Sequence, residues 1–194
     1  LPAAIGVGVA LVALVVATLV WFHWGFVLVV AIALALGAVE VYQALRRLGM
    51  NAAIQPIAVG TLAVVIGSYM AAERKDIPTN TFMLAALSLT VLAALVWRMP
   101  GGQDNFVKDA AASLFVIGYV PLLGSFVALM MAGERGTWRF LTMLAIVVAS
   151  DTGGYIVGVL FGKHPMAPRI SPKKSWEGLA GSDALGVAAG IPMP

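Results

Sequence analysis

The chain has 194 residues, of which 61% are hydrophobic and only 11% are charged. Soluble domains carry roughly 25% charged residues, so this composition excludes an ordinary water-soluble globular protein. The mean hydropathy of +0.96 predicts instead that most of the surface meets lipid. The net charge of +3 does not indicate nucleic-acid binding, because the 12 Lys and Arg residues lie in short groups between apolar runs. The absence of cysteine excludes disulfides, thiolate metal sites and cysteine catalysis.

Apolar runs of about 20 residues, the length of a membrane-spanning helix, recur along the chain. We expect six such helices, and the start of a seventh beyond Gly178, in one all-α polytopic membrane domain over residues 1–194. An aromatic turn at 21–24 separates the first two spans, and Pro121 predicts a kink in the fifth. Because the chain begins with Leu1 and stops within an apolar run, we expect it to be a fragment of a longer protein. The predicted spans are 2–20, 25–45, 56–72, 81–97, 110–132 and 138–161.

The distribution of basic residues predicts the orientation of these spans. Cytoplasmic connections of membrane proteins carry an excess of Lys and Arg. The connections on one side hold eight, Arg46, Arg47, Arg98, Lys108, Lys163, Arg169, Lys173 and Lys174, and those on the other hold four, Arg74, Lys75, Arg135 and Arg139. We therefore expect a multi-pass protein of the plasma membrane with the loop after the sixth span in the cytoplasm.

Asp151 is the acidic residue that stands out, because it lies 13 residues into the sixth predicted span. That position is about 20 Å along a hydrocarbon core of about 30 Å. An ionised carboxylate there costs about 2.5–3.5 kcal/mol unless it is paired, hydrated or bound to a metal. Asp151 is therefore a candidate functional residue, and the alternative is a hydrogen bond that packs one helix on another.

Glycines follow Asp151 at a spacing of four residues, at Gly154, Gly158 and Gly162. This spacing places them on one helical face, beside Asp151 and Tyr155, where a second helix can approach closely. Helix packing alone explains such a stripe, and packing is compatible with catalysis. A homodimer formed through the stripe is also open at this stage.

The segment KHPMAPRISPKKSWEG is the only strongly polar stretch of the chain. Ser171 and Pro172 form a good N-cap and N1 pair, so we expect a helix to start there with Lys173 and Lys174 in its first turn. Two cations at the positive end of a helix are explained by a bound anion such as phosphate, and the alternative is a basic loop at the lipid surface. Glu177 is spaced either to pair with Lys173 or to face the site.

The run SDTGGYIVGVLFGKHPMAPRISPKKSWEG resembles the central region of the phosphatidate cytidylyltransferases, or CDP-diacylglycerol synthases, of the actinobacterial type. In that family an Asp-Thr-small-Tyr element ends a membrane helix, and a Gly-Lys loop leads to Ser-Pro-Lys-Lys-Thr-Trp-Glu-Gly. Ser175 stands here at the usual Thr position. The resemblance is tight over 149–181, is looser upstream, and marks 151–181 as the motif region.

The resemblance implies an enzyme that transfers CMP from CTP to phosphatidate in the membrane lipid, releases pyrophosphate and requires Mg²⁺. It implies that Asp151 helps to hold a metal and that Lys173 and Lys174 act with it in catalysis. The implied substrate-binding residues are Ser171, Tyr155, Lys163, Arg169 and Glu177.

The family signature that follows this region, with further catalytic carboxylates, is not found before Pro194. The run after Ser182 also departs from the next helix of the family. We therefore expect residues 1–194 alone to be inactive and the parent protein to be active.

Two other classes of protein are alternatives. An ion-coupled transporter or channel would also use an intramembrane Asp151 beside a glycine-interrupted helix. It does not account for the SPKKSWEG loop. A non-catalytic membrane scaffold would tolerate the loss of the Asp151 charge.

Overall fold

The computed structural model describes residues 2–74, 78–132, 135–169 and 171–191. Apart from two short strands, the regular elements of these residues are helices, so the expected all-α class is confirmed. Contacts divide the chain into two compact units, Leu1–Glu134 and Arg135–Pro194. This division does not test the prediction of a single membrane domain, which stays a prediction.

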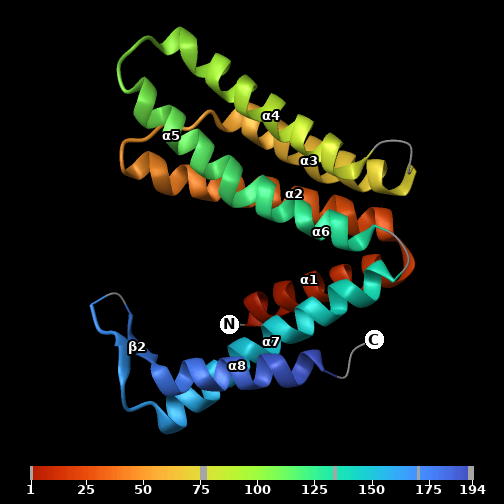
Figure 1. Ribbon diagram of the computed structural model, residues 1–194, viewed down its shortest axis with the longest axis vertical. Helices are drawn as coiled ribbons and strands as arrows, with labels where there is room; N and C mark the ends of the chain where they lie inside the picture. The colour runs from red at the N-terminus through yellow and green to blue at the C-terminus, as the bar shows by residue number, and fades with distance from the viewer. Residues whose placement is uncertain (1, 75–77, 133–134, 170, 192–194) are drawn as a thin grey trace. The chain divides into compact units, whose positions relative to one another are not determined.

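Unit 1 is a bundle of helices whose positions follow the predicted spans closely. The aromatic turn predicted at 21–24 is shorter than expected, because only Phe22 interrupts the helices there. Figure 1 labels the elements, which are α1 (Pro2–Trp21), α2 (His23–Arg47), α3 (Ile54–Arg74), α4 (Thr79–Arg98), η1 (Met99–Gly101), α5 (Phe106–Ile117), η2 (Gly118–Leu122) and α6 (Leu123–Met131).

Five helical segments of the described residues are long and apolar enough to cross a membrane. They support a multi-pass membrane protein, but they do not confirm six spans and the start of a seventh. Helix α1 covers the first predicted span and is not among the five, and α8 has only 15 residues. The five segments are His23–Arg47, Ile54–Arg74, Thr79–Gly101, Phe106–Met131 and Gly136–Phe161.

The fifth predicted span is interrupted at Pro121, as expected. Pro121 lies in η2, a π-helical turn between α5 and α6. Proline has no backbone N–H, and its ring clashes with the carbonyl four residues earlier in a regular α-helix. A local change of helical winding accommodates both effects.

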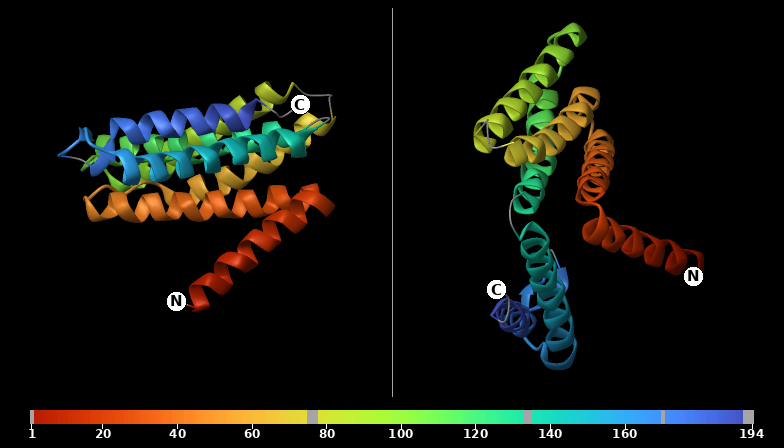
Figure 2. Two further views of the ribbon diagram at one scale, coloured as in Figure 1. Left: turned by 90° about the horizontal axis from the view of Figure 1, so that it is seen from below. Right: turned by 90° about the vertical axis from the view of Figure 1, so that its right-hand side faces the viewer.

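The core of unit 1 is built from small and branched apolar side chains on α2, α3 and α5. Ala38, Ile57, Val64 and Val116 are completely buried. Helices α3 and α4 lie side by side (Figures 1 and 2), and a Cβ added at Gly60 would meet the side chain of Thr90. The absence of a side chain at Gly60 therefore allows this close contact.

A buried ion pair fastens the loops at one end of unit 1. Arg98 donates from Nε to Oδ2 of Asp109 at 2.7 Å, and the Asp109 side chain is only 3% exposed. The second carboxylate oxygen accepts the backbone N–H of Asn51 at 2.7 Å. Arg98 also donates from Nη2 to the carbonyl of Asp104 at 2.6 Å. One carboxylate thus joins α4, α5 and the connection after α2.

Replacing Asp109 by Ala should destabilise unit 1 by about 3–5 kcal/mol, because it leaves a largely buried guanidinium and a backbone N–H without their acceptor. The free energy of unfolding in detergent micelles measures this loss. The control is Asp104→Ala, which removes an exposed carboxylate but keeps the carbonyl that Arg98 uses. Equal stability of the two variants would contradict the role given to the ion pair.

Unit 2 consists of two helices and a hairpin, namely α7 (Gly136–Phe161), β1 (Pro165–Ala167), β2 (Ser171–Ser175) and α8 (Trp176–Gly190). The strands are antiparallel, with Pro165 opposite Ser175 and Ala167 opposite Ser171. Helices α7 and α8 run side by side (Figure 2).

The prediction that a helix starts at Ser171 is wrong, because residues 171–175 form β2 and pair with β1. Helix α8 begins at Trp176 and is capped by Ser175, whose Oγ accepts the backbone N–H of Gly178 at 3.1 Å. The first turn therefore holds the acidic Glu177, which suits the positive end of a helix. Lys173 and Lys174 lie in β2, so they are not cations at the positive end of a helix.

The predicted close approach of a second helix along the glycines of α7 is confirmed, and that helix is α8. A Cβ added at Gly154 would lie 3.3 Å from Cβ of Ser182. Gly153, just outside the predicted stripe, is tighter, since a Cβ there would lie 2.5 Å from the carbonyl oxygen of Gly181. Gly162 differs from the prediction, because it ends α7 as its C-cap.

Replacing Gly153 by Ala should destabilise unit 2 by about 1–3 kcal/mol, since the added methyl group must push the backbone of α8 away. Gly186→Ala in α8 is the matched control, because a Cβ there would make an ordinary contact of 3.5 Å with Ser150. That control should be neutral or stabilising by a fraction of about 1 kcal/mol. Thermal unfolding of both variants in the same detergent tests the difference, and similar midpoints would argue against backbone contact at Gly153.

Candidate active site

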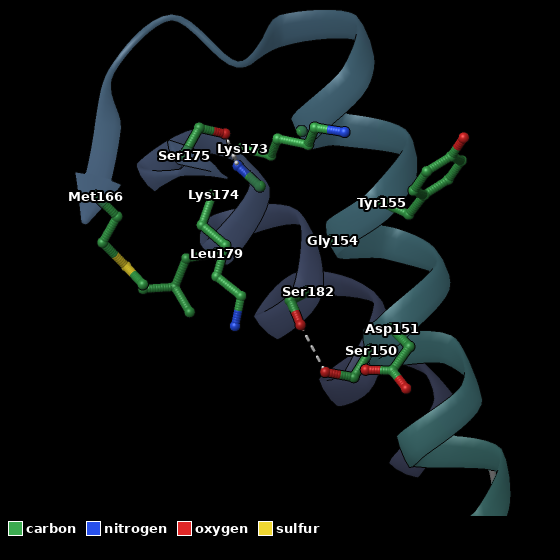
Figure 3. Close-up of a pocket in the computed structure, with 12 residues that line it drawn as sticks. Ser150, Asp151, Gly154, Tyr155, Met166, Lys173, Lys174, Ser175, Leu179 and Ser182 are labelled. Carbon is green, nitrogen blue, oxygen red and sulfur yellow. Dashed lines mark hydrogen bonds between the residues drawn. The ribbon is translucent and has the colours of Figure 1, made fainter. Parts of the chain in front are cut away.

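A pocket of about 350 Å³ lies within unit 2, between α7, α8 and the hairpin (Figure 3). Met166 and Leu179 contribute apolar side chains to its wall, and one aspartate, two lysines and three serines contribute polar ones. The lining residues are Ser150, Asp151, Gly154, Tyr155, Gly158, Met166, Lys173, Lys174, Ser175, Gly178, Leu179 and Ser182.

The structure brings four of the predicted site residues to this pocket, which are Asp151, Tyr155, Lys173 and Lys174. Figure 3 shows the Lys174 side chain extending along the pocket toward the level of Ser182, with Asp151 at the same end. The Tyr155 ring is 73% exposed and projects from α7 away from the lysines. Asp151 and the two lysines thus share one pocket although they are 22 and 23 residues apart in sequence.

The other four predicted residues are not part of the pocket lining. Lys163 and Arg169 are exposed on the connection between the helices, and Ser171 is half-buried at the start of β2. The hydrogen bonds of the Glu177 carboxylate go neither to Lys173 nor to any residue of the pocket lining. Its partner is His164, which is 13 residues earlier.

Two serines at the base of the pocket are not among the predicted site residues. The Oγ atoms of Ser150 and Ser182 are 2.6 Å apart and share a hydrogen bond between α7 and α8. The sequence pattern that indicates Ser182 is its four-residue spacing from Gly178, which places both residues on one face of α8. This hydrogen bond holds the two helices together at the depth of Asp151.

The charged groups of the pocket lining favour an anion. Two lysines and one aspartate give the lining an excess of one positive charge. Lysine binds phosphate as a compact charge, and the carboxylate in the same pocket lining supplies the oxygen ligands that Mg²⁺ prefers. Within the described ranges, no three His, Asp or Glu residues are grouped to hold a metal ion. One carboxylate is nevertheless compatible with Mg²⁺, which is commonly bound by one or two carboxylates together with substrate phosphates.

Glu177 forms a set of hydrogen bonds at the root of the hairpin, outside the pocket lining. Its Oε1 lies 2.6 Å from Nδ1 of His164, and its Oε2 accepts the backbone N–H groups of Lys163 and His164, each at 3.2 Å. The His164 ring, followed by backbone N–H groups including that of Glu177 itself, lowers the pKa of the Glu177 carboxyl from 4.5 to about 2. Because this pKa is lowered, the stabilisation is present above pH 4.5 and is lost as the pH falls toward 2.

Replacing His164 by Ala should raise the pKa of Glu177 toward its ordinary value of 4.5, because the ring makes the largest contribution to the shift. Titration of the ¹³C carboxyl chemical shift in detergent-solubilised protein measures this change. Arg169→Ala removes a cation from the same connection and should leave the Glu177 titration near pH 2. An unchanged titration in His164→Ala would contradict the ring as the main cause.

The fold and the site define a multi-pass membrane protein whose pocket is lined by two lysines and one carboxylate. The cytidylyltransferase family model matches residues 2–193, and the chain belongs to that family. No solved structure matched the chain significantly.

Relatives with a curated name are called phosphatidate cytidylyltransferases. The chain is 38% identical to that of Mycobacterium leprae over 208 residues, which cover 98% of this chain and 64% of the relative. It is also 38% identical to that of Mycobacterium tuberculosis H37Rv, over 98% of this chain and 60% of the relative. A Brucella suis relative is 28% identical over 66% of this chain and 44% of its own length. The chain therefore spans less than two thirds of the mycobacterial proteins, and nothing in these names supports a transporter or channel.

Proposed function

We propose that the whole protein is a phosphatidate cytidylyltransferase, which converts CTP and phosphatidate into CDP-diacylglycerol and pyrophosphate. The observation that carries the proposal is the meeting of Asp151, Lys173 and Lys174 in one pocket of a membrane protein of the cytidylyltransferase family. The names of the mycobacterial relatives supply the substrate and the product.

The proposed reaction is a displacement at the α-phosphorus of CTP. A phosphate oxygen of phosphatidate forms the new P–O bond, and the bond to the β-phosphate breaks as pyrophosphate leaves. Negative charge moves onto the pyrophosphate, so fixed cations aimed at the triphosphate lower the barrier. Lys173 and Lys174 are the residues of the pocket lining that can supply these charges.

We propose Mg²⁺ as the cofactor and Asp151 as the residue of this chain that would hold it. The ion supplies charge neutralisation and orients the phosphates of the nucleotide. Asp151 lines the pocket and is not packed beneath another side chain, so binding a cation there would break no buried contact. The hydrogen bond between the neighbouring Ser150 and Ser182 keeps this part of α7 against α8.

The remaining predicted residues receive supporting roles. Tyr155 borders the pocket and would contact a substrate at its edge. Lys163 and Arg169 belong to the connection before β2, and Ser171 begins β2. We propose that these three residues contribute less to binding than Lys173 and Lys174. The glycine stripe of α7 packs on α8, so a homodimer would need another surface.

We propose that the protein lies in the plasma membrane with the 162–175 connection in the cytoplasm. The excess of Lys and Arg on that side supports this orientation, and CTP is available there. Phosphatidate would reach the pocket from the bilayer, with its phosphate at the headgroup level.

Asp151→Asn in the whole protein should lower kcat by roughly 100-fold or more, because the isosteric amide keeps the shape and loses the charge. Lys174→Met should lower kcat to a similar extent, because it removes a cation that would contact the triphosphate of CTP. The assay is incorporation of radiolabelled CTP into lipid with phosphatidate and Mg²⁺ in detergent micelles. Asp183→Asn removes a carboxylate from an exposed position of α8 and should retain activity. If Asp151→Asn and Asp183→Asn are equally active, Asp151 does not serve this reaction.

A further inference from the structure

The lysine hairpin consists of β1 and β2, and its root is the end at which Pro165 pairs with Ser175. Four hydrogen bonds join the turn before this root to the start of α8. Three end on the Glu177 carboxylate and come from the backbone N–H groups of Lys163 and His164 and from the His164 ring. The fourth runs in the opposite direction, from the backbone N–H of Trp176 to the carbonyl of His164 at 3.0 Å. The two segments therefore hold each other in both directions.

These bonds act on the turn that connects α7 to the hairpin. Helix α7 ends at Phe161, Gly162 leaves the helical conformation with φ −63° and ψ 106°, and β1 begins at Pro165. The amides that Glu177 accepts belong to the two residues between Gly162 and Pro165. Their positions decide the direction in which the chain leaves α7.

The direction of β1 also decides where the lysines lie. Strand β1 pairs with β2, which carries Lys173 and Lys174 into the pocket lining. Ser175 holds the C-terminal end of β2, which lies at the root of the hairpin, by capping α8. A hairpin of two such short strands is only marginally stable by itself, so its orientation depends on these anchors.

We propose that Glu177 is a positioning residue, which clamps the turn at Lys163 and His164 and thereby holds the lysine strand against α7, rather than a ligand of the substrate. The inference rests on the proposed function, because its kinetic consequence requires that the pocket lysines bind CTP. The carboxylate is committed to His164 and to two backbone donors, and Glu177 is not part of the pocket lining.

The test compares Glu177→Ala, Glu177→Gln and the control Asp183→Asn in the whole protein. In Glu177→Ala, kcat/KM for CTP should fall roughly tenfold, which is less than the loss in Lys174→Met, because the lysines are displaced but not removed. The backbone amides of Lys163 and His164 should exchange with deuterium about tenfold faster. Glu177→Gln keeps a carbonyl that accepts the backbone N–H groups, so it should recover most of both losses. Asp183→Asn should match the unmodified protein.

Three results would overturn the proposal. Exchange at residues 163–164 that stays unchanged in Glu177→Ala would show that the carboxylate does not hold the turn. Faster exchange confined to the first turn of α8 would show that Glu177 acts only on the helix end. A Glu177→Gln variant as impaired as Glu177→Ala, with normal exchange at the turn, would identify Glu177 as a direct ligand. If the unmodified protein transfers no cytidylyl group at all, the proposed function fails, while the exchange measurement still decides whether Glu177 clamps the turn.

Discussion

The arrangement of unit 2 depends on direct contact between the backbones of α7 and α8. In a membrane, helices are not driven together by exclusion of water, so association relies on close packing and hydrogen bonds. Gly153 and Gly181 remove the side chains that would hold the helices apart, and the Ser150–Ser182 bond adds a polar link at the same depth. Asp151 and the pocket lysines reach one cavity because α8 lies this close to α7.

Much of the fold could be predicted from the sequence because it follows from local patterns. Apolar runs of membrane length marked the helices of both units within a few residues, and Pro121 marked the interruption between α5 and α6. The Arg98–Asp109 pair could not be found in this way, since its geometry depends on how α4, α5 and the loop at Asn51 meet. A pattern along one helix contains no information about such long-range partners.

The candidate site could be predicted in part, and the wrong helix start at Ser171 shows why the rest could not. Ser-Pro is a strong local signal for a helix start, but the pairing of residues 171–175 with β1 satisfies the same backbone groups through a strand. Ser175 offers an equally suitable cap four residues later and is followed by an acidic residue in the first turn. Strand pairing depends on a partner elsewhere in the chain, so local preferences at Ser171 did not reveal it. The resemblance predicts Asp151, Lys173 and Lys174 as site residues whether the lysines lie on a helix or on a strand, and all three line one pocket.

The hairpin is anchored at its root, by the Glu177 bonds to the turn before β1 and by the Ser175 cap at the end of β2. Its tip, around Pro168 and Arg169, lies at the opposite end of the paired strands. An exposed hairpin tip tolerates changes of length better than an anchored root. The tip can therefore lengthen or shorten without displacing the root, where Ser175 pairs with Pro165.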